Sequence, residues 1–124
     1  MGIKYRPAFP SDEAQLTELF TWASLPVQNL NHVKLVAERD GLLRGAIGIS
    51  DRGFLTPLIA KSPVITLRLV SLFDRILLAN GIKQYAIQVK EDRAMCMRVV
   101  RKLPELYKEI ARNDNTVWYK RTLA

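Results

Sequence analysis

The first 31 residues change from a strand-like to a helix-like pattern of hydrophobic positions. The segment 3–8 is short and is stopped by prolines, which predicts an edge strand. After it, Ser11 offers a capping hydroxyl, and apolar side chains then recur three and four residues apart. They are Leu16, Leu19, Phe20 and Ala23. We therefore expect an amphipathic helix that ends near Pro26, followed by a loop or a single helical turn over 27–31.

Residues 33–60 show the two-residue alternation that is typical of half-buried strands. The pair Asp40-Gly41 separates two such runs. It favours a type I′ hairpin, because both central residues of that turn need positive φ. A second turn over 50–53 leads into the apolar run 54–60. The pattern therefore predicts three strands in a meander.

A wide apolar stripe between residues 63 and 79 predicts a helix that packs against a sheet. Ser62 is a good capping residue, Pro63 suits the first helical position, and Asn80-Gly81 suits a left-handed helix end. The apolar positions that share one face in this interpretation are Val64, Leu67, Val70, Phe73 and Leu77, with Leu69, Leu72 and Ile76 beside them.

The last third of the chain predicts a strand over 82–89, a helix from Glu91 to just before Pro104, and a closing hairpin. The hairpin joins 106–112 to 116–123 through the turn cluster 113–115. The resulting order is β-α-β-β-β-α-β-α-β-β. We expect an α/β (α+β) fold with a mixed central sheet, formed by residues 1–124 as a single domain.

The amino-acid composition gives the chain a net positive charge. The 124 residues carry a formal net charge of +7, and 12 of the 19 basic but only 6 of the 12 acidic side chains fall after residue 62. An anionic partner is therefore plausible. The one cysteine, Cys96, forms no internal disulfide, and we interpret it as buried and inert. With no long apolar segment, the chain is expected to be cytoplasmic and not bound to a membrane.

Three segments carry a resemblance to a known family. They are the opening strand and helix (3–23), the hairpin LVAERDGLLRGAI (35–47) and the helix end LLANGI (77–82). In these segments and in element order, the chain resembles the GNAT family of N-acetyltransferases. The resemblance implies direct transfer of an acetyl group from acetyl-CoA to an amine held between the strands 54–60 and 82–89.

The resemblance also implies where acetyl-CoA would bind. The backbone of Leu58, Ile59 and Ala60 would hold the pantetheine as an added strand, and Lys61, Ser62 and Arg68 would meet phosphate. Two family features are absent. The junction 57–68 has no glycine where the family has a glycine-containing phosphate loop. Glu91 and Arg98 stand where the family has an asparagine and a catalytic tyrosine.

These departures leave a second hypothesis open. The chain would then be a catalytically degenerate GNAT-like module that binds a protein or nucleic acid, for example a viral or phage accessory protein in host cytoplasm or virion. A third hypothesis is that the chain is a basic nucleic-acid-binding domain. The side chains that would contact an acidic protein or nucleic acid are Arg93, Arg98, Arg101 and Lys102. A solvated basic face is the favoured alternative for these side chains, and the family resemblance implies that positive charge near this helix can also meet CoA phosphates.

The resemblance implies three candidate catalytic residues. Glu38 is a candidate general base, with a solvated hairpin charge as its alternative. Gln88 and Tyr85 would lie on the strand beside the acceptor, although Tyr85 also fits a core aromatic residue with its hydroxyl at the surface. His32 has no second ligand at metal-binding spacing, so no metal is expected. The edge of the closing hairpin could pair with a second copy.

Overall fold

The computed structural model describes residues 2–90 and 107–123. Each strand and helix that the sequence predicts within these ranges is present, and the helix predicted after Glu91 lies outside them. The strands are β1 (Lys4–Pro7), β2 (Val33–Arg39), β3 (Leu42–Ile49), β4 (Leu55–Ala60), β5 (Gln84–Lys90), β6 (Tyr107–Asn113) and β7 (Thr116–Thr122). The helices are α1 (Glu13–Trp22) and α2 (Pro63–Ala79), with 3-10 turns at Pro10–Asp12 and Val27–His32.

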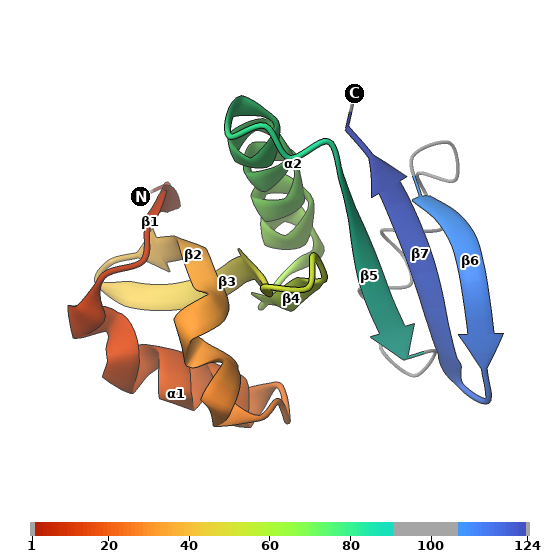
Figure 1. The fold of residues 1–124 in the computed structure, drawn as a ribbon. Helices are drawn as coiled ribbons and strands as arrows, with labels where there is room; N and C mark the ends of the chain where they lie inside the picture. Colours follow the sequence, from red (N-terminus) through yellow and green to blue (C-terminus); the bar gives the residue numbers. More distant parts are fainter. Residues whose placement is uncertain (1, 91–106, 124) are drawn as a thin grey trace.

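The strands form two antiparallel sheets rather than one continuous sheet. The first has the order β1-β2-β3-β4 and the second the order β5-β7-β6 (Figure 1). They meet at one isolated parallel bridge, between Phe54 and Ala86. The α+β class is confirmed, and among the described residues the parallel part of the expected mixed sheet is reduced to this bridge.

Local turn chemistry fixes the hairpins as predicted. Asp40 and Gly41 have φ values of 53° and 79°, the left-handed pair that a type I′ turn requires. In the closing hairpin, Asp114 has a φ of 51°. The hairpin predicted at Asp40-Gly41 is therefore confirmed, with Arg39 paired to Leu42 across the two-residue turn.

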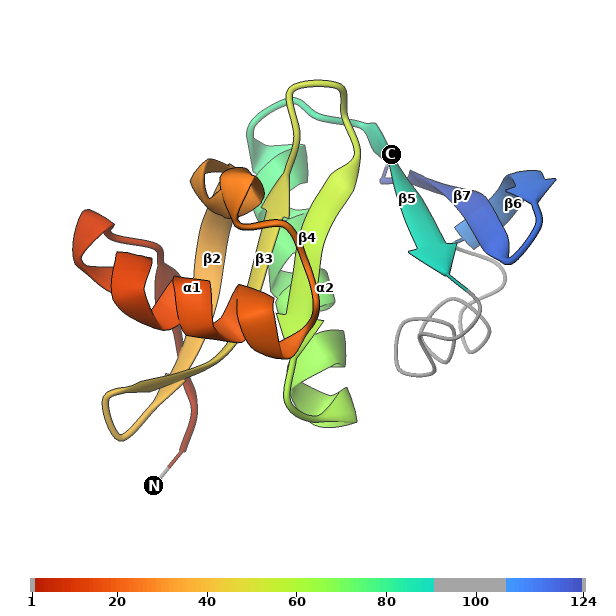
Figure 2. The ribbon, with the colours of Figure 1, turned by 90° about the horizontal axis from the view of Figure 1, so that it is seen from below.

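The two helices cover opposite faces of the first sheet (Figure 2). Under α1, the core contains Leu16, Phe20, Val36 and Ala46, and under α2 it contains Ile47, Leu69 and Phe73. Successive residues of β2 and β3 therefore enter different cores. This explains why the central strands are apolar on both faces.

The buried face of α2 is rotated from the predicted one. Val64 and Leu67 are exposed, and the residues that pack against the sheet are centred on Ile65, Leu69 and Phe73. The stripe was too wide for periodicity alone to locate its centre. The predicted ends are correct, because Ser62 Oγ accepts a hydrogen bond from the Ile65 N–H at 3.2 Å and Gly81 has a φ of 81°.

The start of α1 also differs from the prediction, because Ser11 does not cap it. Pro10 begins a 3-10 turn that already contains Ser11, and Asp12 occupies the cap position of α1. The Asp12 carboxylate accepts hydrogen bonds from the Phe9 N–H at 2.8 Å and from Arg6 at 2.9 Å. These bonds anchor the turn to β1.

Gly45 allows α2 to lie close to β3. A Cβ at this position would come within 2.9 Å of both Ile59 O and Leu69 Cδ1. We expect Gly45→Ala to lower the free energy of unfolding by about 1–3 kcal/mol through overpacking. Urea unfolding measures this. Gly2→Ala is the matched control, because nothing lies within 4 Å of its added Cβ. Equal stability of the two variants would contradict this account of the α2–β3 contact.

Candidate functional site

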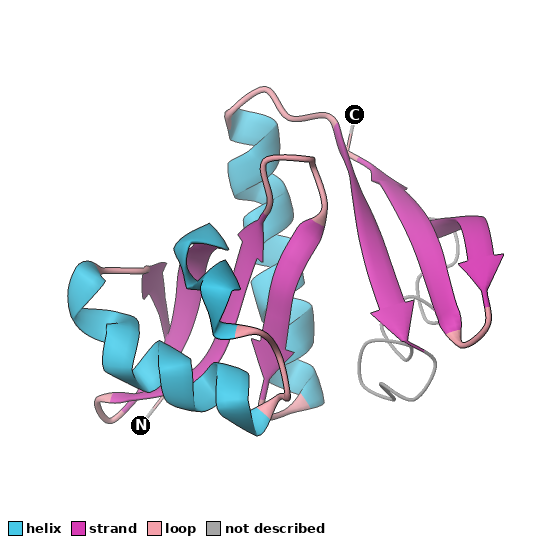
Figure 3. Ribbon diagram, turned by 60° about the horizontal axis from the view of Figure 1, so that its bottom comes forward, coloured by secondary structure: helices cyan, strands magenta, loops and turns pink. Residues whose placement is uncertain are grey.

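Strands β4 and β5 are joined by a single backbone bridge and diverge beyond it. The Ala86 N–H donates to Gly53 O at 3.0 Å, next to the Phe54–Ala86 bridge. Beyond this bridge the two strands separate (Figure 3), and β4 forms the edge of the first sheet. Within the described parts of the chain, no other strand pairs with that edge.

The pairing of β4 with β3 determines which peptide groups are directed to the β5 side. The Lys61 N–H donates to Arg44 O at 3.0 Å, and the register pairs Ala60 with Gly45 and Ile59 with Ala46. Because peptide groups of an antiparallel strand alternate between its two edges, Leu58 and Ala60 direct theirs toward β5. Ile59 directs its own toward β3. Of the three residues in the prediction, Leu58 and Ala60 therefore have peptide groups on the open side of β4.

The N-terminus of α2 begins just after this edge and is already partly capped. Ser62 Oγ accepts from the Ile65 N–H, Ser62 O accepts from the Thr66 N–H at 3.1 Å, and Pro63 has no N–H. The Val64 N–H is the remaining donor of the first turn. A helix N-terminus favours anions, but this one offers fewer donors than the glycine-containing loop that the resemblance implies.

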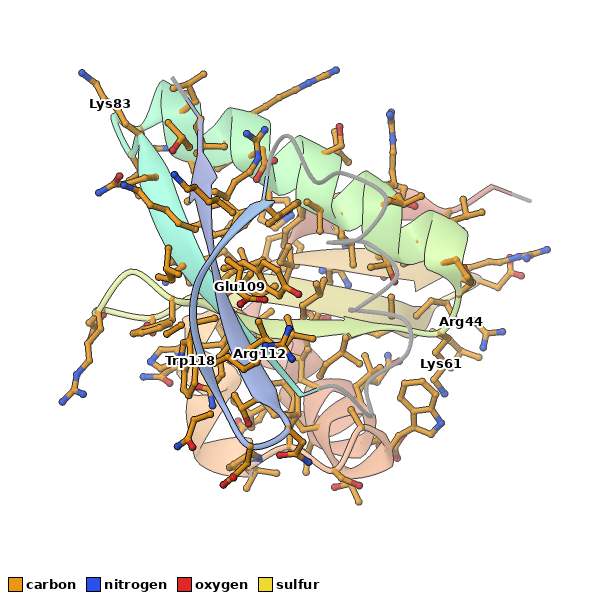
Figure 4. All side chains as sticks on the ribbon, turned by 90° about the vertical axis from the view of Figure 1, so that its right-hand side faces the viewer. Arg44, Lys61, Lys83, Glu109, Arg112 and Trp118 are labelled. Carbon is orange, nitrogen blue, oxygen red and sulfur yellow. The ribbon has the colours of Figure 1, made fainter. Side chains whose placement is uncertain are left out.

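Two cations lie beside the start of α2 (Figure 4). Lys61 follows β4, and its Nζ lies 5.0 Å from the ring centroid of Trp22, a cation–π geometry. Arg44 occupies an irregularity of β3, where the pairing with β2 shifts between Ala37 and Glu38. Both line a cavity of about 240 Å³, together with Gln15, Glu18, Leu19, Leu42 and Leu43. The sequence prediction included Lys61 but missed Arg44.

Arg68 does not join these cations at the first turn of α2. It lies further along the helix, close enough to Tyr5 of β1 that its charge partly offsets the rise in the pKa of Tyr5 caused by burial. The predicted phosphate contacts therefore separate into Lys61 and Ser62 at the start of α2 and Arg68 on the side of β1.

Glu38 is engaged in an ion pair. Arg6 donates to Glu38 Oε2 from Nη2 at 2.7 Å and from Nε at 3.2 Å. The same guanidinium binds Asp12 and, with that hydrogen bond as the main cause, holds the pKa of the Asp12 carboxyl below its usual range. Glu38 thus lies on β2, two strands away from the edge of β4.

Tyr85 belongs to a buried polar network between α2 and the second sheet. Its hydroxyl donates to Asp74 Oδ1 at 2.9 Å and lies 3.0 Å from the Tyr107 hydroxyl. Arg121 Nε donates to Asp74 Oδ2 at 3.3 Å. Burial raises the pKa of Tyr85 and of Asp74. Sequence reasoning placed this hydroxyl at the surface, which is wrong, because its partners come from distant elements.

Gln88 lies on the opposite face of β5 from Tyr85. Tyr85, Ile87 and Val89 are buried, and Gln88 is exposed two residues beyond Ala86. The three candidate catalytic residues are therefore not brought together. Of the three, Gln88 is exposed and lies on β5 where this strand has separated from β4. Cys96, Glu91 and the basic cluster Arg93, Arg98, Arg101 and Lys102 lie outside the described residues.

Comparison with known proteins gives a match at the level of structure. No protein-family model matches the chain, and no curated protein matches its sequence. A GNAT-family acetyltransferase from Staphylococcus aureus Mu50 superposes with a TM-score of 0.77 at 14% identity, over 99% of this chain and 100% of that one. The yncA protein of Salmonella typhimurium, whose structure contains its cofactor acetyl-CoA, gives 0.79 at 15% identity over 100% and 95%.

This chain has a GNAT-like fold. A third structure agrees, because the paia N-acetyltransferase of Thermoplasma acidophilum, in complex with coenzyme A, gives a TM-score of 0.71 at 16% identity over 98% and 99%. The GNAT-like fold covers the described elements from β1 to β7, and the resemblance seen in the sequence is confirmed as a fold.

In the described parts of the chain no helix is long and apolar enough to span a membrane, and no three metal-binding side chains cluster.

The tyrosine network of this GNAT-like fold predicts a loss of stability at alkaline pH. Burial raises the pKa of Tyr107 from 10.0 to about 12. Between these values the unfolded chain releases the Tyr107 proton while the folded chain keeps it, so stability is full below pH 10 and falls as pH rises. We expect Tyr107→Phe to remove up to about 1.4 kcal/mol per pH unit of this slope.

Urea unfolding from pH 9 to 12 measures the slope. The free energies of unfolding of wild type and variant should differ by a constant amount below pH 10, and the difference should shrink above pH 10. Parallel curves throughout would show that Tyr107 does not ionise differently in the folded chain.

Proposed function

We propose that the chain binds acetyl-CoA along the edge of β4 and transfers its acetyl group to an amine, with residues 1–124 acting as one GNAT-like domain. The observation that carries this proposal is the divergence of β4 and β5 beyond the Phe54–Ala86 bridge, with α2 beginning just after the far end of β4. The similarity to structures that contain acetyl-CoA or coenzyme A supports it.

The backbone and the two cations divide the binding between them. The peptide groups of Leu58 and Ala60 pair with the amide groups of pantetheine, as an added strand would. The pyrophosphate then lies near the start of α2, where the Val64 N–H, Lys61 and Arg44 meet its charge. With so few N–H donors at this helix, we expect the side-chain cations to contribute a larger share of phosphate binding.

The transfer itself needs an amine placed between the separating strands. The amine nitrogen attacks the thioester carbonyl carbon, a C–N bond forms and the C–S bond breaks. The thiolate leaves as coenzyme A, and the amine releases a proton to solvent. The chain's part in this scheme is to bind and align the two reactants. Gln88 contacts the acceptor, while Glu38 and Tyr85 support β2 and β5 through the partners described above.

Removing the cations should weaken binding of acetyl-CoA. We expect Lys61→Gln and Arg44→Gln each to raise its Kd about fivefold, the effect of about 1 kcal/mol that exposed charge contacts contribute. Isothermal titration with acetyl-CoA and with coenzyme A measures this. Lys34→Gln is the matched control, an exposed lysine on β2. Saturable binding that all three variants retain unchanged would overturn the proposed phosphate position, and no binding by wild type at millimolar ligand would overturn the function.

Gln88 and Gln84 offer a matched pair on one face of β5. They lie on either side of Ala86, so only Gln88 lies where β5 has separated from β4. Coenzyme A release is first measured over a panel of polyamines, aminoglycosides and lysine peptides to find an acceptor. We then expect Gln88→Ala to raise the KM for that acceptor severalfold at unchanged affinity for acetyl-CoA, and Gln84→Ala to leave both constants unchanged. Equal effects of the two changes would argue against a role for Gln88.

The capped start of α2 favours a second candidate function. Ser62 and Pro63 use or remove donors that a phosphate would need, and the candidate catalytic residues do not converge. The alternative is a catalytically inactive GNAT-like module that binds a protein or nucleic acid. Binding of coenzyme A with acetyl transfer to none of the acceptors would favour this module.

A further inference from the structure

The second sheet has one face that is exposed and different in composition from the other. Buried Tyr85, Ile87, Val117 and Tyr119 define its inner face. Because side chains alternate along a strand, the register assigns the other positions to an outer face. They are Gln84, Ala86 and Gln88 of β5, Thr116, Trp118, Lys120 and Thr122 of β7, and Lys108, Ala111 and Asn113 of β6.

Among the described residues, the assigned positions of the outer face include lysines but no carboxylate. None of its ten assigned positions is Asp or Glu, and Lys108 lies directly opposite Lys120 in the register. Like charges at such a pair destabilise a sheet. Neither lysine has a carboxylate within ion-pair distance among the described residues. On the inner face, by contrast, Arg121 pairs with Asp74 at 3.3 Å and Arg112 with Glu109 at 2.8 Å.

Trp118 adds a planar aromatic group beside this charge. It lies on the central strand β7, half-buried, with Gln88 and the small Ala111 as its neighbours across the sheet. Figure 4 shows Trp118 on one side of the β6 and β7 ribbons and Arg112 and Glu109 on the other. Lys120 follows on the same face two residues later, next to Lys108.

We infer that the outer face of the second sheet binds single-stranded nucleic acid, with a base stacked on Trp118 and phosphates on Lys108 and Lys120. Aromatic side chains interleaved with cations on an open sheet face are the arrangement that binds single strands with little sequence preference. The exposed amides of Gln84 and Asn113 offer hydrogen bonds to base edges. The surface does not include the edge of β4, where acetyl-CoA is proposed to bind, and it borders the proposed acceptor site at Gln88.

The fluorescence of Trp118 tests this surface directly. In a Trp22→Phe protein Trp118 is the only tryptophan, so its quenching reports on its own surroundings. We expect a short oligothymidylate to quench it saturably at low salt. We expect Trp118→Ala, measured by anisotropy of a labelled oligothymidylate, to weaken binding on the order of tenfold.

The lysines are tested by a double variant with a matched control. Lys108→Gln with Lys120→Gln should reduce the slope of log K against log salt by about 1.4, because each phosphate contact to a single strand contributes about 0.7. Lys4→Gln with Lys34→Gln removes the same charge from exposed positions of the first sheet and should leave the slope unchanged. Three results would overturn the proposal: no quenching at low salt, equal losses in the two double variants, or equal quenching by polyglutamate, which would indicate an acidic protein instead.

Discussion

Strand β4 pairs with β3 on one side, while its other side is joined to β5 only by the backbone bridge at Phe54, just before β4 begins, and the proposed site follows from this constraint. Peptide groups at a strand edge need hydrogen-bond partners, and those of Leu58 and Ala60 face the side where β5 has moved away. The same divergence places an exposed Gln88 beside that edge, and α2 begins three residues after it. An extended ligand with amide groups and a terminal anion matches this arrangement, which is why the fold and the proposed acetyl-CoA site agree.

Two neighbouring residues of β5 hold the divergence in place. Ala86 bonds to the turn before β4, and Tyr85 bonds to Asp74 of α2. Arg121 of β7 joins the same carboxylate, so α2 is linked to two strands of the second sheet. Tyr85 therefore links β5 to α2. Its hydroxyl is buried, and the separation of the sheets beyond it determines what can bind between them.

Most of the fold could be predicted from local sequence patterns. Asp40-Gly41, Ser62-Pro63 and Asn80-Gly81 fix turns and helix ends through the backbone conformations that these residues prefer. The site was harder to predict, because its contacts join residues far apart in the chain. Glu38 meets Arg6 and Tyr85 meets Asp74 only once the sheets have formed. The β3 irregularity that places Arg44 beside Lys61 has no local signal, and so Arg44 was missed.

Amide hydrogen exchange at three consecutive residues tests the central claim most directly. In the free protein, the amides of Leu58 and Ala60 should exchange quickly and that of Ile59, directed toward β3, slowly. Saturating acetyl-CoA should slow exchange at Leu58 and Ala60 and leave Ile59 unchanged. Unchanged exchange at Leu58 and Ala60 in the presence of bound acetyl-CoA would contradict binding along the edge of β4.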